Sequence, residues 1–227
     1  MAGRRPLTPD EEIKLLRVVR ALAPRDRALV TTQWMTGFRI SEVLSLTVGS
    51  VVRGGELAGK IGVAPRHLKG GYGRTRWIPV LPELAKALEK HPGCLRRRFE
   101  LVPAMPLFLS RECALGEEMR ALSRESARRI IRGAFAQAKL LDDGRLGTHT
   151  LRKTWARKVY ENSGNDLMFF KAALGHSDIS ITQKYFEVSE DAVAAAIARC
   201  DLAKIRPRPA KIVEIAKIAG TRPAVAG

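Results

Sequence analysis

The residue pattern of this 227-residue chain changes between Val51 and Val80. β-Branched residues recur in this stretch, and glycines at 54–55 and 70–71 interrupt it, which is typical of short antiparallel strands joined by tight turns. On both sides of the stretch the apolar residues recur at helical spacing instead. The chain is therefore expected to be a mostly α protein with a small antiparallel β-sheet.

Helix-starting and helix-breaking residues divide the flanking regions. Thr8 lies three residues before Glu11, which predicts an N-cap and a capping box. Pro92 predicts the end of a helix, and residues 92–106 are expected to be irregular. The helices expected from such signals cover residues 9–23, 24–36, 40–46, 81–90, 124–140, 148–162, 165–175 and 189–203, with a short one starting at 177 or 178.

The chain shows no internal repeat and no linker that demands two large domains. We expect one domain over residues 1–204, followed by a basic, flexible tail over residues 205–227. Three cysteines form neither a CxxC pair nor an even set, which favours a reducing compartment. No stretch approaches the ~20 apolar residues of a membrane span. A soluble, cytoplasmic protein without a membrane partner is expected.

The charge balance points to a polyanionic partner. The chain has 40 Lys and Arg residues against 23 Asp and Glu residues, a formal charge of +17. Such an excess commonly neutralises nucleic-acid phosphates, where counterion release supplies affinity without base reading. A solubilising surface, a ribosomal partner or a membrane-surface partner would also fit the charge alone.

A series of polar residues suggests metal-free attack on a phosphodiester. A phenol has a reference pKa of about 10 and needs nearby cations before it can act as a nucleophile. His149 and Arg152 are three residues apart at an expected helix start, where backbone amides favour an anion. Taken singly, each residue also fits a packing or surface role. The candidate catalytic residues are Arg39, Lys69, His149, Arg152, His176 and Tyr185.

A metal site is not expected. The chain has four histidines, and no Cys/His spacing in it resembles a zinc site. No cofactor is expected either.

Four segments of the chain resemble, in order and spacing, the motifs of the tyrosine recombinases, the phage integrase family. They are WMTGFRISEVLSLT, LKGGYGRTRWIPV, THTLRKTWARKVY and ALGHSDISITQKYFEV. The resemblance covers about residues 7–200. It implies the tyrosine recombinase catalytic-domain fold and site-specific DNA breakage and rejoining without metal or ATP.

The resemblance also implies residue roles. Arg39 and Arg152 are similar to the arginines that hold the scissile phosphate, and Glu42 to the acidic residue that supports the first arginine. His149 is similar to the residue that positions this phosphate and shares in proton transfer. Lys69, on the expected β-hairpin, resembles the lysine that protonates the leaving 5′ oxygen.

Two further roles lie near the C-terminus. His176 resembles the residue that hydrogen-bonds a phosphate oxygen, and Tyr185 the nucleophile that forms a 3′-phosphotyrosyl intermediate. Additional candidate DNA contacts are Arg74, Arg76 and Lys153.

Family resemblance implies double-stranded DNA as partner and a homotetramer on DNA. Relatives commonly carry a helical core-binding domain first, and few residues precede the first helix expected here. DNA binding is therefore expected to depend on the catalytic domain, the basic tail, an accessory DNA-binding protein or a part outside this chain. Two alternatives remain open: a recombinase-like DNA-binding or regulatory protein with little cleavage, and a type IB topoisomerase.

Overall fold

The computed structural model describes residues 4–68, 75–96, 100–110, 119–141, 143–164, 166 and 168. The chain divides into two units, Met1–Phe186 and Glu187–Gly227, and the described residues lie in the first. The predicted boundary after residue 204 is outside them. The elements are α1 (Pro9–Ala21), α2 (Pro24–Thr36), α3 (Ile40–Leu44), α4 (Val48–Val51), β1 (Val52–Arg53), β2 (Glu56–Leu57), β3 (Lys60–Val63), a 3-10 turn η1 (Pro65–His67), β4 (Arg76–Pro79), α5 (Pro82–Arg96), α6 (Arg124–Gln137) and α7 (Thr148–Asn162).

The predicted helix starts are confirmed by their caps. The Thr8 hydroxyl accepts a hydrogen bond from the Glu11 amide at 3.3 Å, and the Glu11 carboxylate accepts one from the Thr8 amide at 2.8 Å. Ser123 caps α6 in the same way, through the Ser126 amide at 3.1 Å. Each cap satisfies amides that a helix start leaves without an intrahelical partner. None of the helices in the described ranges is long and apolar enough to cross a membrane.

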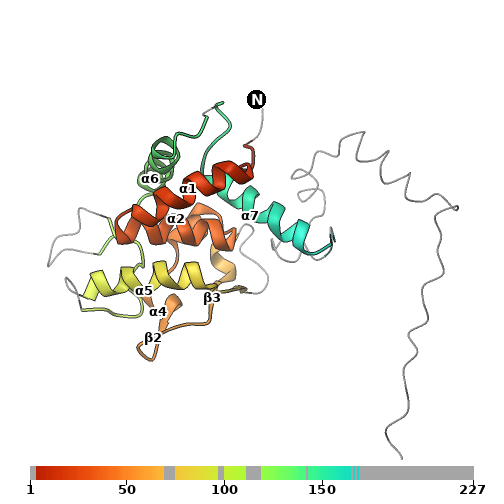
Figure 1. Ribbon diagram of the computed structural model, residues 1–227. Coiled ribbons are helices and arrows are strands. Elements are labelled where there is room, and N and C mark those ends of the chain that lie inside the picture. Colours follow the sequence, from red (N-terminus) through yellow and green to blue (C-terminus); the bar gives the residue numbers. More distant parts are fainter. Residues whose placement is uncertain are drawn as a thin grey trace, which may run out of the picture. The chain divides into compact units, whose positions relative to one another are not determined.

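Helix α2 is the centre of the fold, since it packs on α1, α5, α6 and α7 (Figure 1). Its residues are buried on more than one face, which suits a helix surrounded by others. Leu29 belongs to a core cluster with Phe38 and Leu88. Val30, the next residue, belongs to a second cluster with Leu151. One helix thus joins two parts of the core.

The strands form two antiparallel pairs, β1 with β2 and β3 with β4, in separate sheets. The small antiparallel sheet structure is confirmed, although one sheet was expected. In the second pair Ile61 lies opposite Ile78, and both are buried. Trp77, on the other face, is 49% exposed, as alternation along a strand requires. The expected glycine-rich turn at residues 69–74 lies outside the described residues.

Helix α5 is longer than predicted, because it continues through Pro92 to Arg96. A proline inside a helix removes one backbone hydrogen bond. Here the turn around it is held by buried contacts: His91 Nε2 lies 2.6 Å from the Leu107 carbonyl oxygen, and its ring stacks on Phe108. Pro92 and Leu95 are also buried. Packing therefore outweighs the local signal that predicted an irregular segment.

The turn after α2 brings distant elements together. Gly37 ends α2 in the left-handed conformation, with φ of 60°, and its amide donates to the Gln33 carbonyl at 3.1 Å. A Cβ at this position would lie inside van der Waals contact with the Trp155 ring of α7. Both the conformation and the close approach require glycine.

We predict that Gly37→Ala destabilises the fold more than Gly54→Ala. The two glycines have nearly the same φ, 60° and 58°, but a Cβ on Gly54 would meet nothing within 4 Å. Gly54→Ala should cost only the backbone term, roughly 1–2 kcal/mol. Gly37→Ala should add roughly 1–3 kcal/mol for overpacking. Urea denaturation gives both values, and equal losses would contradict the packing of Trp155 on Gly37.

Candidate active site

A buried carboxylate, that of Glu42, organises the candidate site. Glu42 lies in α3 and has no exposed surface. Its Oε1 lies 2.7 Å from Arg39 Nη1. Its Oε2 lies 3.8 Å from Arg76 Nη1 and 3.9 Å from Arg152 Nη1. Because β4 and α7 supply the last two arginines, the carboxylate gathers three cations from separate parts of the chain.

Arg39 is the most accessible of the three arginines, with 25% of its side chain exposed. It is the N-cap of α3 and has an extended backbone. Its amide donates to Glu42 Oε2 at 2.8 Å, so Glu42 holds both its backbone and its guanidinium. This double contact leaves the side chain little freedom and keeps its charge at the surface of the site.

Arg152 lies in the interior, with 1% of its side chain exposed. Its Nη1 donates a hydrogen bond to the Gly37 carbonyl oxygen. Helix α7 is thus tied to the turn that follows α2.

Arg76 is placed in the interior too. Its Nη2 donates to the Thr36 carbonyl oxygen at 2.9 Å. Its guanidinium lies 5.0 Å from the ring centre of Phe38 and 5.3 Å from that of Trp155. The sequence predicted Arg76 as a DNA contact, whereas the structure places it under the surface, because the two rings and Glu42 offer its cation a partner there.

His149 lies in the first turn of α7, where part of the residue is exposed and part is covered by the protein. Partial loss of hydration lowers the pKa of His149 below its ordinary value, and the positive charges of Arg152, Arg39, Arg4 and Lys153 lower it further, in that order. The neutral imidazole therefore prevails at neutral pH. In that form one ring nitrogen can accept a proton.

The described residues bring together Arg39, Glu42, His149 and Arg152, and Lys153 lies half-buried beside them. Four other predicted site residues, Lys69, Arg74, His176 and Tyr185, lie outside the described residues.

Two nearby residues were not predicted. Trp155 covers Gly37 and Arg76, and its spacing of three from Arg152 on α7 was a signal for a shared face. Arg4 contributes to the field at His149, and nothing in the sequence around it indicated this.

The histidines do not form a metal site within the described part of the chain, where no group of three or more His, Cys, Asp or Glu residues could hold an ion. His91 is a core residue: burial lowers the pKa of its imidazole, and its ring lies between α5 and Phe108.

Comparison with known proteins relates the chain to one protein family. The model of the phage integrase family matches residues 5–192. Tyrosine recombinase XerC of Herpetosiphon aurantiacus is 29% identical over 191 residues, which are 84% of this chain and 56% of that protein. The chain spans about half the length of the curated relatives it matches.

Solved structures share the fold. The crystal structure of XerA recombinase matches 92% of this chain and 67% of its own, with a TM-score of 0.67 and 24% identity. The pre-cleavage complex of XerH site-specific recombinase bound to its difH substrate matches 87% of this chain and 55% of its own, with a TM-score of 0.66 and 19% identity.

We predict that Glu42→Gln lowers the free energy of unfolding by about 3 kcal/mol or more, because breaking a buried pair leaves an uncompensated charge. Glu125→Gln is the control, since Glu125 is 66% exposed and pairs with Arg128 at 3.6 Å. Its effect should stay within about 0.5 kcal/mol. Urea denaturation measures both, and a loss for Glu42→Gln as small as that of the control would contradict the organising role of this carboxylate.

We predict that His149 titrates below the ordinary imidazole pKa of 6.5 in an NMR experiment. Arg39→Gln should raise the pKa of His149, because one of the charges that oppose protonation is removed. Arg17→Gln, on the exposed face of α1, removes the same charge at a distance and should leave the titration unchanged. A midpoint above 6.5, or equal shifts in the two variants, would refute this electrostatic environment.

Proposed function

Because this chain belongs to the phage integrase family, we propose that it breaks and rejoins double-stranded DNA at defined sites. The covalent intermediate joins Tyr185 to a 3′ phosphate. The observation that carries the proposal is the cluster around Glu42, where Arg39, Arg152 and His149 meet. Such an excess of positive charge suits a phosphate better than any neutral substrate.

The arginines stabilise charge in the proposed mechanism. Arginine cannot lose its proton in a protein, so Arg39 and Arg152 take no part in proton transfer. Arg39, with its partly exposed guanidinium, makes the direct contact to the scissile phosphate. Arg152 adds positive charge from the interior, where low polarisability strengthens its effect on a neighbouring anion. Arg76 is assigned a positioning role, because it holds the Thr36 carbonyl and faces Glu42.

The covalent step balances without another reactant. The Tyr185 oxygen attacks phosphorus, the new O–P bond forms and the bond to the 5′ oxygen breaks. The neutral imidazole of His149 takes the phenolic proton, and Lys69 gives a proton to the leaving 5′ oxygen. His176 hydrogen-bonds a phosphate oxygen. Attack by the 5′ hydroxyl of another strand reverses the step, so the mechanism requires neither metal nor ATP.

The working form is proposed to be a homotetramer on DNA in the cytoplasm, with an accessory DNA-binding protein as a further partner. The likeness of the fold to XerH site-specific recombinase, solved bound to difH, supports DNA as the ligand. Residues 205–227 are proposed as a basic tail outside a catalytic domain of residues 1–204, with Lys153 and Arg74 as further DNA contacts.

Covalent trapping tests the function. DNA fragments bound by the protein in its source genome are prepared as nicked duplexes, incubated with the protein and run on denaturing gels. We expect a protein–DNA band for the wild type and for Tyr160→Phe, a control on α7, and none for Tyr185→Phe. Arg39→Gln should lower the rate at which the covalent protein–DNA complex forms by about 10²-fold or more, the usual loss for one charge-stabilising donor. EDTA should have no effect.

Three outcomes would contradict the proposal. A trapped band in Tyr185→Phe would assign the nucleophile elsewhere, and no band in any variant on a bound site would favour a DNA-binding accessory protein. Relaxation of arbitrary supercoiled plasmids by the monomer would favour a type IB topoisomerase.

A further inference from the structure

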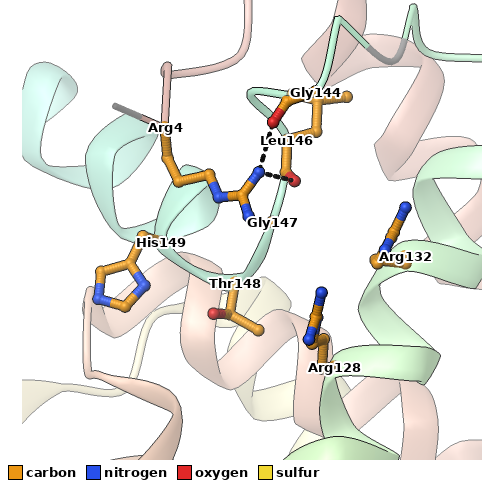
Figure 2. Close-up of a pocket in the computed structure, with 8 residues that line it drawn as sticks. All are labelled: Arg4, Arg128, Arg132, Gly144, Leu146, Gly147, Thr148 and His149. Atoms are coloured by element: carbon orange, nitrogen blue, oxygen red, sulfur yellow. Dashed lines mark hydrogen bonds between the residues drawn. The ribbon is translucent and has the colours of Figure 1, made fainter. Parts of the chain in front are cut away.

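A cavity of about 280 Å³ lies between α6 and the start of α7 (Figure 2). A water molecule takes up about 30 Å³ of liquid, so the cavity has room for a small polyatomic group. Its lining comes from the N-terminal segment, from α6 and from the loop and first turn that lead into α7. The lining residues are Arg4, Arg128, Arg132, Gly144, Leu146, Gly147, Thr148 and His149.

The cavity is electropositive. Three of its lining residues are arginines, His149 is the fourth basic residue, and no carboxylate belongs to the lining. The lowered pKa of His149 has Arg4 among its causes, which is consistent with a positive field at this place. An anion would therefore be stabilised here.

Arg4 is fixed in place before any ligand arrives. Its Nη1 donates to the Gly144 carbonyl at 2.6 Å and to the Leu146 carbonyl at 3.0 Å, as Figure 2 shows. Its Nε would lie 3.1 Å from a Cβ on Gly147, so the side chain lies directly along this glycine. The two bonds use one of the three guanidinium nitrogens. The Arg4 side chain is thus already ordered in the free protein. Binding of an anion therefore costs less conformational entropy.

Arg128 and Arg132 face the cavity from one side of α6, as their spacing of four residues requires (Figure 2). Arg128 also pairs with Glu125 at 3.6 Å, and both side chains are at least half exposed. Such an exposed pair is weak and can give way to a phosphate. Arg128 therefore supplies an adjustable donor opposite the fixed Arg4, and Arg132 adds a positive charge one turn further along α6.

We propose that this cavity is a second phosphate site, which holds a DNA backbone phosphate next to the one that is cut. The inference rests on the proposed function, since it takes DNA as the ligand. His149 links the two sites, because it lines the cavity and also lies near Arg39 and Arg152. A strand held at both sites cannot slide, so the second contact sets which phosphate meets the catalytic residues.

The test compares DNA affinity at several salt concentrations for Arg128→Gln/Arg132→Gln and for Arg124→Gln/Arg129→Gln. All four arginines are exposed on α6, and only the first two line the cavity. DNA binding is measured with a short fluorescent duplex of arbitrary sequence. For Arg128→Gln/Arg132→Gln, the cavity variant, the fall of log affinity with log salt should be shallower by about 0.9, the value for one phosphate. Its affinity at low salt should fall roughly tenfold, the usual value of a charged hydrogen bond. The control should change both values by less than half as much.

Equal losses in the two double variants would overturn the proposal, because charge would then act diffusely along α6. So would an unchanged slope in the cavity variant. Urea denaturation of each variant checks the fold, and Arg4→Gln should reproduce the loss of slope. A second arm adds inorganic phosphate and follows thermal stability. Phosphate could stabilise the wild type and not the cavity variant while both give the same salt slope for DNA binding. In that case the cavity binds a free anion and the proposal fails.

The binding measurement does not depend on cleavage. If covalent trapping fails while the cavity variant shows the expected shallower salt slope than the wild type, the recombinase function alone is refuted. If trapping succeeds while the cavity variant and the wild type have the same salt slope, the second phosphate site alone is refuted.

Discussion

The arrangement of the site depends on one ionic cluster, formed by the buried carboxylate of Glu42 and the three guanidinium groups around it. A carboxylate without any exposed surface is stable only when cations replace the water it has lost. Arg39 does so from the N-cap of the same helix, and Arg152 and Arg76 do so from α7 and β4. The requirement therefore positions α7 and β4 relative to α3. It also positions the end of α2 and the turn after it, whose carbonyl oxygens accept hydrogen bonds from Arg76 and Arg152.

Three cations and one carboxylate leave a positive excess, and this excess is what makes the site suitable for a phosphate. The pKa of His149 falls first because the imidazole is partly removed from water, and the same field lowers it further because protonation would add another cation. An imidazole kept neutral beside arginines can take a proton while the arginines hold the charge of the phosphate. The cavity lined by Arg4 and α6 extends this positive region beyond His149.

Local signals were good predictors where local physics decides. Capping by Thr8 and Ser123 follows from side-chain-to-amide hydrogen bonds within one turn, and it agrees with the structure. The expected bounds of α7 agree with the structure too. The signal from Pro92 failed, because buried contacts of α5 outweigh one lost hydrogen bond. Arg76 was predicted as a DNA contact next to the glycine-rich turn, whereas it is buried. Its burial depends on Phe38, Trp155 and Glu42, which lie far from it in sequence.

The sequence by itself determined the starts of α1 and α6, the short antiparallel strands and the positive charge, because caps, hydrophobic period and composition belong to the residues themselves. Its motifs also named Arg39, Glu42, His149 and Arg152, which the structure brings together. Only the tertiary structure decided which arginine is accessible and which is enclosed. It also decided that Gly37 lies under Trp155, and that Arg4 reaches the loop before α7. These outcomes depend on burial and on contacts across the chain, which no local pattern records.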